Sequence, residues 1–256
     1  MPPAARWPAR ASSVLLGTAV AAVSAGAVPS CTAGANPDTL YQRGMEAYRG
    51  HQMGPAADNL DAFAAKACRP PKPDARCRKA NMSLARAREA QDSPAGAWAA
   101  YDAALGFPPH DTDDQVRASR DQAQQDLVAR NGSAADHGPV LVRYRDEVSE
   151  EYTPRSVVIS LDFEAVLTQD KDAASLHSAD FRKVYGGSIP AGEHVLVIET
   201  VHDCRPGGGP CARAHVRKAW PFRNAPHTPT TIEVRAYAEE GGADAPARPA
   251  IDVSTR

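Results

Sequence analysis

The chain has 256 residues, of which 23% are charged and 43% are hydrophobic, and its formal net charge at pH 7 is −2. This length is sufficient for two modest domains with a core each. The near-neutral charge offers no basic face of the kind that nucleic acid requires, so we expect no nucleic-acid partner.

Residues 1–30 have the pattern of a secretory signal peptide. Arg6 and Arg10 precede a stretch from residue 11 to residue 30 that contains no charged side chain. A basic start, an apolar middle and a small-residue exit are the parts of such a signal. The apolar part is rich in Ala, Gly and Ser, so the alternative, a retained transmembrane helix, would be a weak one. We therefore expect an exported protein.

Two cleavage sites fit this leader. Residues 25–27 form an A-x-A site that would release a soluble protein starting at Val28. Residues 28–31 (VPSC) resemble the lipobox of bacterial lipoproteins, in which the thiol of the Cys is acylated before cleavage. The resemblance implies lipid attachment at Cys31, a tether over residues 31–37, and retention at a membrane surface in the periplasm or at the outer membrane.

The five cysteines bear on this choice. Four of them form two close pairs, Cys68 with Cys77 and Cys204 with Cys211. Outside the cytosol, such pairs are expected to form disulfides. Cys31 is then the unpaired thiol, and lipidation would give it a function. The cysteine count therefore favours the anchored protein over the secreted one, and we expect no cofactor.

Residues 38–131 predict an all-helical domain of about five helices, because Ala, Leu and Tyr recur at helical spacing between Pro and Gly. One set of residues has the offsets of the small, aromatic and proline positions of a tetratricopeptide repeat. These residues are Ala85, Ala97, Tyr101, Ala104 and Pro109. An earlier unit has similar positions at Gly44, Ala56, Leu60 and Ala64.

The resemblance to tetratricopeptide proteins implies a concave surface for a peptide or protein partner, with Gly44, Tyr48 and Tyr101 as candidate contact residues. Small side chains at the repeat positions allow paired helices to approach closely. Two units are fewer than the three that such stacks usually need, so we expect the helices to lean on another part of the protein. A plain helical bundle is the alternative.

A last helix is predicted from Thr112 to Arg130, with the Asn131–Gly132 pair as its stop signal. Its expected apolar stripe consists of Val116, Ala123, Leu127 and Val128. The composition of residues 132–139 predicts a linker.

Residues 140–238 predict a small antiparallel β-sandwich. Apolar and polar residues alternate over residues 157–164 and 232–237, as in strands with one buried face. Residues 195–198 (VLVI) are all apolar, as in a central strand covered on both faces. Residues 239–256 are dense in Ala, Pro and Gly and predict a disordered tail.

A turn at Pro190, Gly192 and His194 leads into this apolar strand. Proline fixes one backbone angle and glycine permits the other, which makes a tight turn. The motif resembles the turn of PEGA-type surface modules. The resemblance implies an envelope interaction module, with cell-wall polysaccharide as a further candidate partner and no catalytic residues. The segment from Cys204 to Cys211 is predicted to be a hairpin tip closed by a disulfide.

Three other chemistries have partial support in the sequence. A zinc site could be drawn from His202, Cys204, Cys211 and His215, but oxidised cysteines cannot supply it. Asp162 and Glu164 fall on one face of the predicted strand and could form an acid/base pair, although alternation alone predicts a solvated polar face. Residues 168–173 resemble the lysine hairpin of lipoyl domains, which implies Lys171 as the lipoylated residue of a dihydrolipoamide acyltransferase carrier.

The sequence therefore predicts an α+β two-domain protein and a non-catalytic envelope lipoprotein that binds protein or cell wall as a scaffold. The alternative is a secreted enzyme or ligand carrier with a site at the domain junction. The expected divisions are a signal peptide (1–30), a lipidated tether (31–37), a helical domain (38–131), a linker (132–139), a β-sandwich (140–238) and a disordered tail (239–256).

Overall fold

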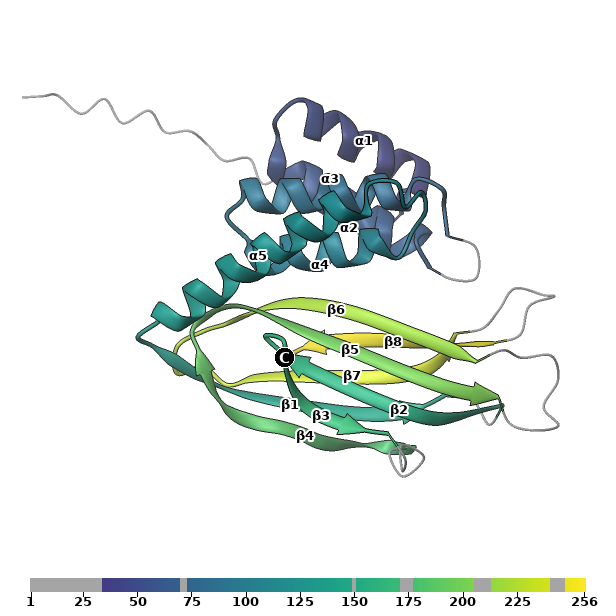
Figure 1. The fold of residues 1–256 in the computed structure, drawn as a ribbon, viewed down its shortest axis with the longest axis vertical. Coiled ribbons are helices and arrows are strands. Elements are labelled where there is room, and N and C mark those ends of the chain that lie inside the picture. Colours follow the sequence, from purple (N-terminus) through teal and green to yellow (C-terminus); the bar gives the residue numbers. More distant parts are fainter. Residues whose placement is uncertain (1–33, 70–72, 149–150, 171–176, 205–212, 240–246) are drawn as a thin grey trace, which may run out of the picture.

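The computed structural model describes residues 34–69, 73–148, 151–170, 177–204, 213–239 and 247–256. An N-terminal helical part is followed by two four-stranded sheets, and the helices lie over one of the sheets (Figure 1). This arrangement confirms the predicted α+β two-domain layout. No helix in the described part of the chain is both long and apolar enough to cross a membrane.

The helical part packs each helix against the next one in the chain. Its members are α1 (Pro37–Arg49), α2 (Met53–Ala67), α3 (Cys77–Ala90), α4 (Pro94–Leu105) and α5 (Asp113–Ser133). The side chain of Asn36 accepts a hydrogen bond from the Thr39 amide at 2.8 Å and caps α1. A Cβ atom on Gly44 would lie 2.7 Å from Cγ of Leu60, so only glycine permits the close approach of α1 and α2.

The predicted Cys68–Cys77 disulfide is present. It joins Cys68, the capping residue directly after α2, to Cys77, the first residue of α3, across the proline-rich connection. Closure of so short a loop restricts the unfolded chain and contributes about 2–3 kcal/mol to stability.

The last helix differs from its prediction at the C-terminal end. It continues to Ser133, so the Asn131–Gly132 pair lies inside it, and only three residues separate it from the first strand. The predicted linker over residues 132–139 is therefore wrong. Val128, which was expected in the apolar stripe, is 52% exposed, whereas Leu127 is fully buried.

The β part is a sandwich with sheet orders β4-β1-β7-β8 and β3-β2-β5-β6. Its strands are β1 (His137–Glu147), β2 (Tyr152–Leu161), β3 (Glu164–Gln169), β4 (Ser178–Pro190), β5 (Gly192–Cys204), β6 (Ala214–Asn224), β7 (Thr230–Glu239) and β8 (Arg248–Thr255). All described neighbours are antiparallel except β1 and β7, which run parallel. The predicted antiparallel sandwich therefore contains one parallel pair of strands.

Two further expectations for this part are wrong. The predicted disordered tail contains β8, which pairs with β7 and buries Pro249, Ile251 and Val253 at alternate positions. The alternation of buried and exposed residues decides the structure here, despite the Ala- and Pro-rich composition, because the alternate side chains reach the sandwich core. The Ala-, Pro- and Gly-rich composition of residues 239–256 concealed this strand.

The strand predicted through residue 164 ends earlier. Asp162 and Phe163 have φ values of 46° and 74° and form the two-residue turn between β2 and β3. Two positive φ angles are typical of the tight hairpin turn that suits twisted strands. Glu164 is exposed and lies beyond the turn, so the chain reverses between the two carboxylates that were considered as an acid/base pair.

The apolar run of β5 explains how the two parts join. Leu196 and Ile198 belong to the sandwich core, and Val195 and Val197 face the helices on the other side of the sheet. Trp98 of α4 packs in this second cluster. Helices α4 and α5 therefore cover the outer face of β5, which confirms the expectation of a strand buried on both faces and explains how the short helical stack leans on a support.

Candidate functional site

The predicted turn motif lies where the two parts meet. Pro190 ends β4 in one sheet and Gly192 begins β5 in the other, so the turn carries the chain between sheets. Gly192 has φ of 143°, which side chains rarely adopt, and this explains the glycine. His194 follows and is completely buried. The motif therefore has a structural role at the junction.

A polar latch, made of His194, Asp162 and Asn131, fastens this junction. Nδ1 of His194 lies 2.5 Å from Oδ2 of Asp162, and Nε2 lies 2.8 Å from the carbonyl oxygen of Pro190. The Asn131 amide, at the end of α5, donates to the same Asp162 carboxylate at 3.1 Å. Both ring nitrogens of His194 therefore have polar partners, and these contacts join the β2–β3 turn, the start of β5 and the end of α5.

An aromatic and ionic cluster lies beside the latch. The rings of Trp98 and Phe163 are 5.0 Å apart. Asp102 of α4 accepts hydrogen bonds from Arg217 of β6 at 2.8 Å and from Arg120 of α5 at 3.2 Å. These contacts join α4, α5 and the outer sheet face, so the helical part is held in one orientation on the sandwich.

The helical part carries a groove of about 450 Å³ between α1, α3 and the residues before α5. Its lining includes Met45, Met82 and Tyr48. Its lining holds four cationic side chains and one carboxylate. They are Arg49, Arg78, Lys79, Arg86 and Asp111. The groove therefore combines adaptable apolar side chains with a positive rim, which is suited to an acidic peptide segment.

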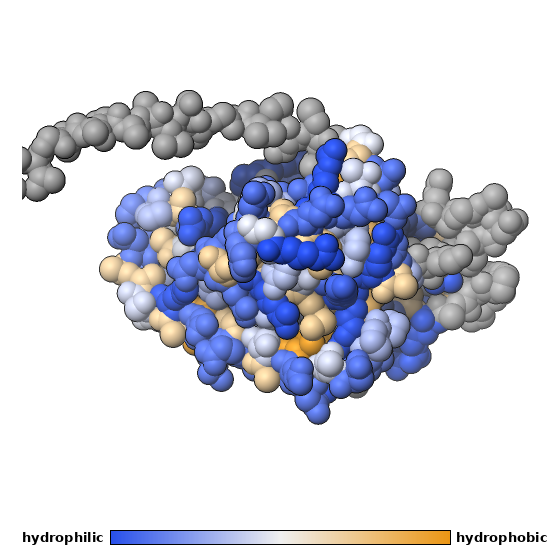
Figure 2. Space-filling model, turned by 90° about the horizontal axis from the view of Figure 1, so that it is seen from above, coloured by the Kyte–Doolittle hydropathy of each residue, from blue (hydrophilic) through white to orange (hydrophobic). Residues whose placement is uncertain are grey.

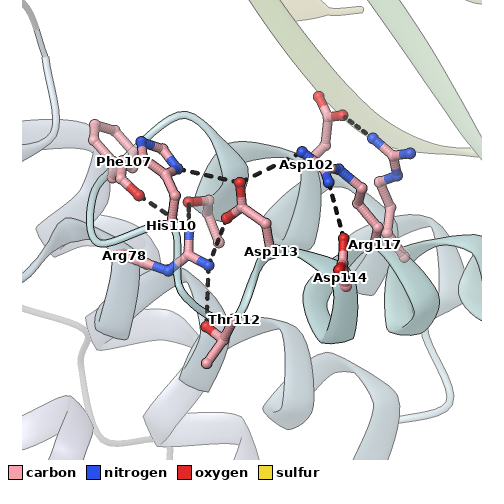
Figure 3. A network of polar contacts seen from close by, with 10 residues as sticks. Arg78, Asp102, Phe107, His110, Thr112, Asp113, Asp114 and Arg117 are labelled. Carbon is pink, nitrogen blue, oxygen red and sulfur yellow. Dashed lines mark hydrogen bonds and ion pairs between the residues drawn. The ribbon is translucent and has the colours of Figure 1, made fainter.

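One wall of the groove is fixed by the buried guanidinium of Arg78 (Figure 3). It donates to the carbonyl oxygens of Ala104 and Phe107 at 3.2 and 3.0 Å and to the Thr112 hydroxyl at 3.1 Å. It also lies 2.8 Å from the Asp113 carboxylate. These bonds tie α3 to the end of α4 and the start of α5, and they neutralise Arg78.

The structure separates the three predicted contact residues. Gly44 and Tyr101 are buried within the helical core, and only Tyr48 lines the groove. The Tyr101 hydroxyl donates to Glu89 at 3.1 Å, and burial, together with the Glu89 charge, raises the pKa of Tyr101 to about 12. Arg86 is hydrogen-bonded to Tyr48. Gly44 and Tyr101 therefore serve packing.

The groove residues that the sequence reasoning missed share one spacing signal. Met45 and Arg49 are four residues apart on α1, and Lys79, Met82 and Arg86 are three and then four residues apart on α3. Residues at these spacings lie on one face of a helix. This spacing is visible in the sequence, but it indicates a shared groove only because α1 and α3 are neighbours in the fold.

A second hollow, which we call the junction cavity, lies between the helical part and the strands β6 and β8. Its volume is about 560 Å³. Residues from α2, α3 and α4 form one wall, and residues such as Lys218, Trp220 and Ile251 form the other. Seen from the helical side, the surface of the molecule is mostly hydrophilic with scattered apolar residues (Figure 2).

The zinc alternative does not fit the structure. His202 is buried and bonded to Asp146, while His215 is exposed and lies one register position away, on the opposite face of the sheet. Cys204 is disulfide-bonded, and Cys211 lies outside the described residues, so their pairing stays a prediction. Within the described ranges, no three His, Cys, Asp or Glu side chains are grouped to hold a metal ion.

The other chemical predictions concern residues that the structure does not describe. The signal peptide, Cys31 and Lys171 all lie outside the described ranges. Export, lipid attachment and the lipoyl-carrier alternative therefore stay predictions.

A scan against protein-family models, a search of curated proteins and a search of solved structures found no match. The likeness to tetratricopeptide and PEGA modules therefore depends on the sequence motifs.

Proposed function

We propose that the protein is an exported, non-catalytic binding protein, held at the cell envelope by a lipid on Cys31, whose helical groove takes an acidic segment of a partner protein. The observation that carries the proposal is the charge of the groove. Arg49, Lys79 and Arg86 are exposed along it, and Asp111 is the one carboxylate in its described lining.

The chemistry of the groove favours a peptide with carboxylates beside an apolar anchor. Methionine side chains are flexible and adapt to varied apolar partners, and the groove lining contains the half-buried Met82 and the more buried Met45. Exposed cations attract carboxylates over a range that salt shortens. Binding through this groove is therefore expected to weaken as the ionic strength rises.

The sandwich supports this groove from the other side of the helical part. The latch and the Trp98 cluster fix α4 and α5, and Arg78 connects them to α3. A pre-formed groove loses less conformational entropy on binding.

The alternative of a ligand carrier is favoured by one observation, the junction cavity, which concerns a small molecule rather than a peptide.

The test uses the purified full chain and a library of peptides that contain Asp or Glu next to Leu or Met. We expect the double variant Lys79→Glu, Arg86→Glu to bind the tightest acidic peptide at least about tenfold more weakly than the wild type does, which is a loss of ~1.4 kcal/mol in binding free energy. Fluorescence anisotropy at low and high salt measures this. Lys183→Glu on β4, far from the groove, is the matched control and should bind as the wild type does. Equal binding of acidic and basic peptides, or no effect of the double reversal, would contradict the proposal.

A further inference from the structure

The junction cavity exists because small side chains face each other across it. Helices α4 and α5 make the main contacts with the sandwich, and α2 and α3 stand further from it. The walls contain alanines from α2, α4, β6 and β8. These are Ala64, Ala65, Ala99, Ala100, Ala103, Ala219 and Ala250. The volume of about 560 Å³ lies in the range of small-molecule sites.

The cavity lining has more cations than carboxylates. The cations are Arg69, Arg88, Arg217, Lys218 and Arg248, and the carboxylates are Asp61, Glu239 and Asp252. Three of the cations are paired: Arg69 with Glu239, Arg88 with Asp61, and Arg217 with Asp102 of α4. Among the described residues, Lys218 and Arg248 have no carboxylate within ion-pair distance.

Of these two cations, Lys218 is the more buried. It is half-buried, whereas Arg248 is exposed. Its Nζ donates to the Ile251 carbonyl oxygen at 3.1 Å and lies 5.6 Å from the centre of the Trp220 ring. Burial lowers the pKa of Lys218, with partial opposition from the charge of Asp252. The ammonium group is thus partly removed from water, and the Asp252 carboxylate acts on it only from beyond ion-pair distance, so a bound anion would offset the desolvation cost.

We propose that the junction cavity binds a carboxylic acid with an unbranched apolar chain, such as a fatty acid, with its carboxylate at Lys218 and its chain along the alanine walls and Trp220. The apolar walls favour a chain over a compact anion such as phosphate, which would leave most of the cavity in contact with water. The one half-buried ammonium group, that of Lys218, suits a ligand with a single negative charge. This site is separate from the helical groove and does not depend on the function proposed for it.

The experiment compares decanoate with decanol, which has the same chain and no charge, by isothermal titration calorimetry on the full chain at pH 7. We expect decanoate to bind at least tenfold more tightly than decanol. Lys218→Met approximately keeps the length of the side chain and removes its charge. It should therefore weaken the binding of decanoate about tenfold and leave the binding of decanol unchanged.

A second variant protects the test against misfolding at Lys218. Ala103 is an exposed residue of the cavity wall, and Ala103→Phe should fill the space and abolish binding of both ligands. Lys183→Met on the far edge strand β4 should bind both ligands as the wild type does. Equal affinity for decanoate and decanol, undetectable binding of decanoate, or unchanged decanoate binding in either cavity variant would overturn the proposal.

Discussion

Replacing His194 with alanine is expected to lower the free energy of unfolding by about 3–5 kcal/mol, because it removes a completely buried ring and leaves its hydrogen-bond partners unpaired. His194 is completely buried, and its two ring nitrogens contact Asp162 and the Pro190 carbonyl oxygen. Without the ring, both groups lose a hydrogen-bond partner, and a cavity forms beside Phe222, whose ring stacks on the imidazole.

Urea unfolding at pH 7 measures this loss, and tryptophan fluorescence reports on its location. Trp98 packs on Phe163, the neighbour of Asp162, so loosening of the junction should expose Trp98 to water and shift its emission to the red. Asp162→Ala should lower the free energy of unfolding by a similar amount. The double variant should lower it by less than the sum of the two single losses, since the two residues contact each other. His215→Ala, at an exposed position of β6, is the control and should cost below about 0.5 kcal/mol. A loss below about 1 kcal/mol for His194→Ala would refute the latch.

The second large effect is expected at Asp146, a fully buried carboxylate in the sandwich core. It accepts hydrogen bonds from the Tyr144 hydroxyl at 2.9 Å and the Val148 amide at 3.1 Å, and Nε2 of His202 lies 3.3 Å away. Asp146→Ala leaves these donors unpaired and should lower the free energy of unfolding by about 3–5 kcal/mol at pH 7.

The contribution of Asp146 should also depend on pH. Burial acts to raise the pKa of this carboxyl, but the hydrogen bond and charge of His202, together with Tyr144 and Val148, bring the pKa below its ordinary value. The stabilisation is therefore complete above the unfolded pKa of about 3.9 and is lost as the pH falls through the lower folded pKa.

Urea unfolding from pH 7 to about pH 2.5 tests both statements. The difference in the free energy of unfolding between the wild type and Asp146→Ala should be constant at the upper end of this pH range and should shrink below about pH 4. The exposed Asp180 on β4 serves as the matched control, since Asp180→Ala should show little difference at any pH. A difference that persists unchanged to the acid limit would contradict the assigned role of Asp146.

The parts of the fold that the sequence predicted share strong local signals. The helical spacing before residue 131, the Cys68–Cys77 pair and the turn at Gly192 each depend on residues close together in the chain. The continuous apolar run around Leu196 carried information about tertiary structure, because a strand that is apolar on both faces needs a cover on both.

The remaining features depend on residues that are far apart in the chain. His194 was assigned to a turn motif and Asp162 to a strand face, and nothing local indicates that they bond to each other. The junction cavity likewise forms only when α2 and α4 face β6 and β8 across it, and the Pro- and Ala-rich composition concealed β8. Long-range pairing of this kind is not encoded in hydrophobic periodicity.

The central claim is that the protein is exported and anchored through Cys31, since the proposed partner lies at the envelope. Intact-mass spectrometry of the protein extracted from the membranes of cells that produce it tests this most directly. We predict a polypeptide that begins at Cys31, carries the added mass of acyl chains, and has Cys68 and Cys77 oxidised. An unmodified chain that begins at Val28, or a cytosolic chain with its leader intact and its cysteines reduced, would contradict the claim.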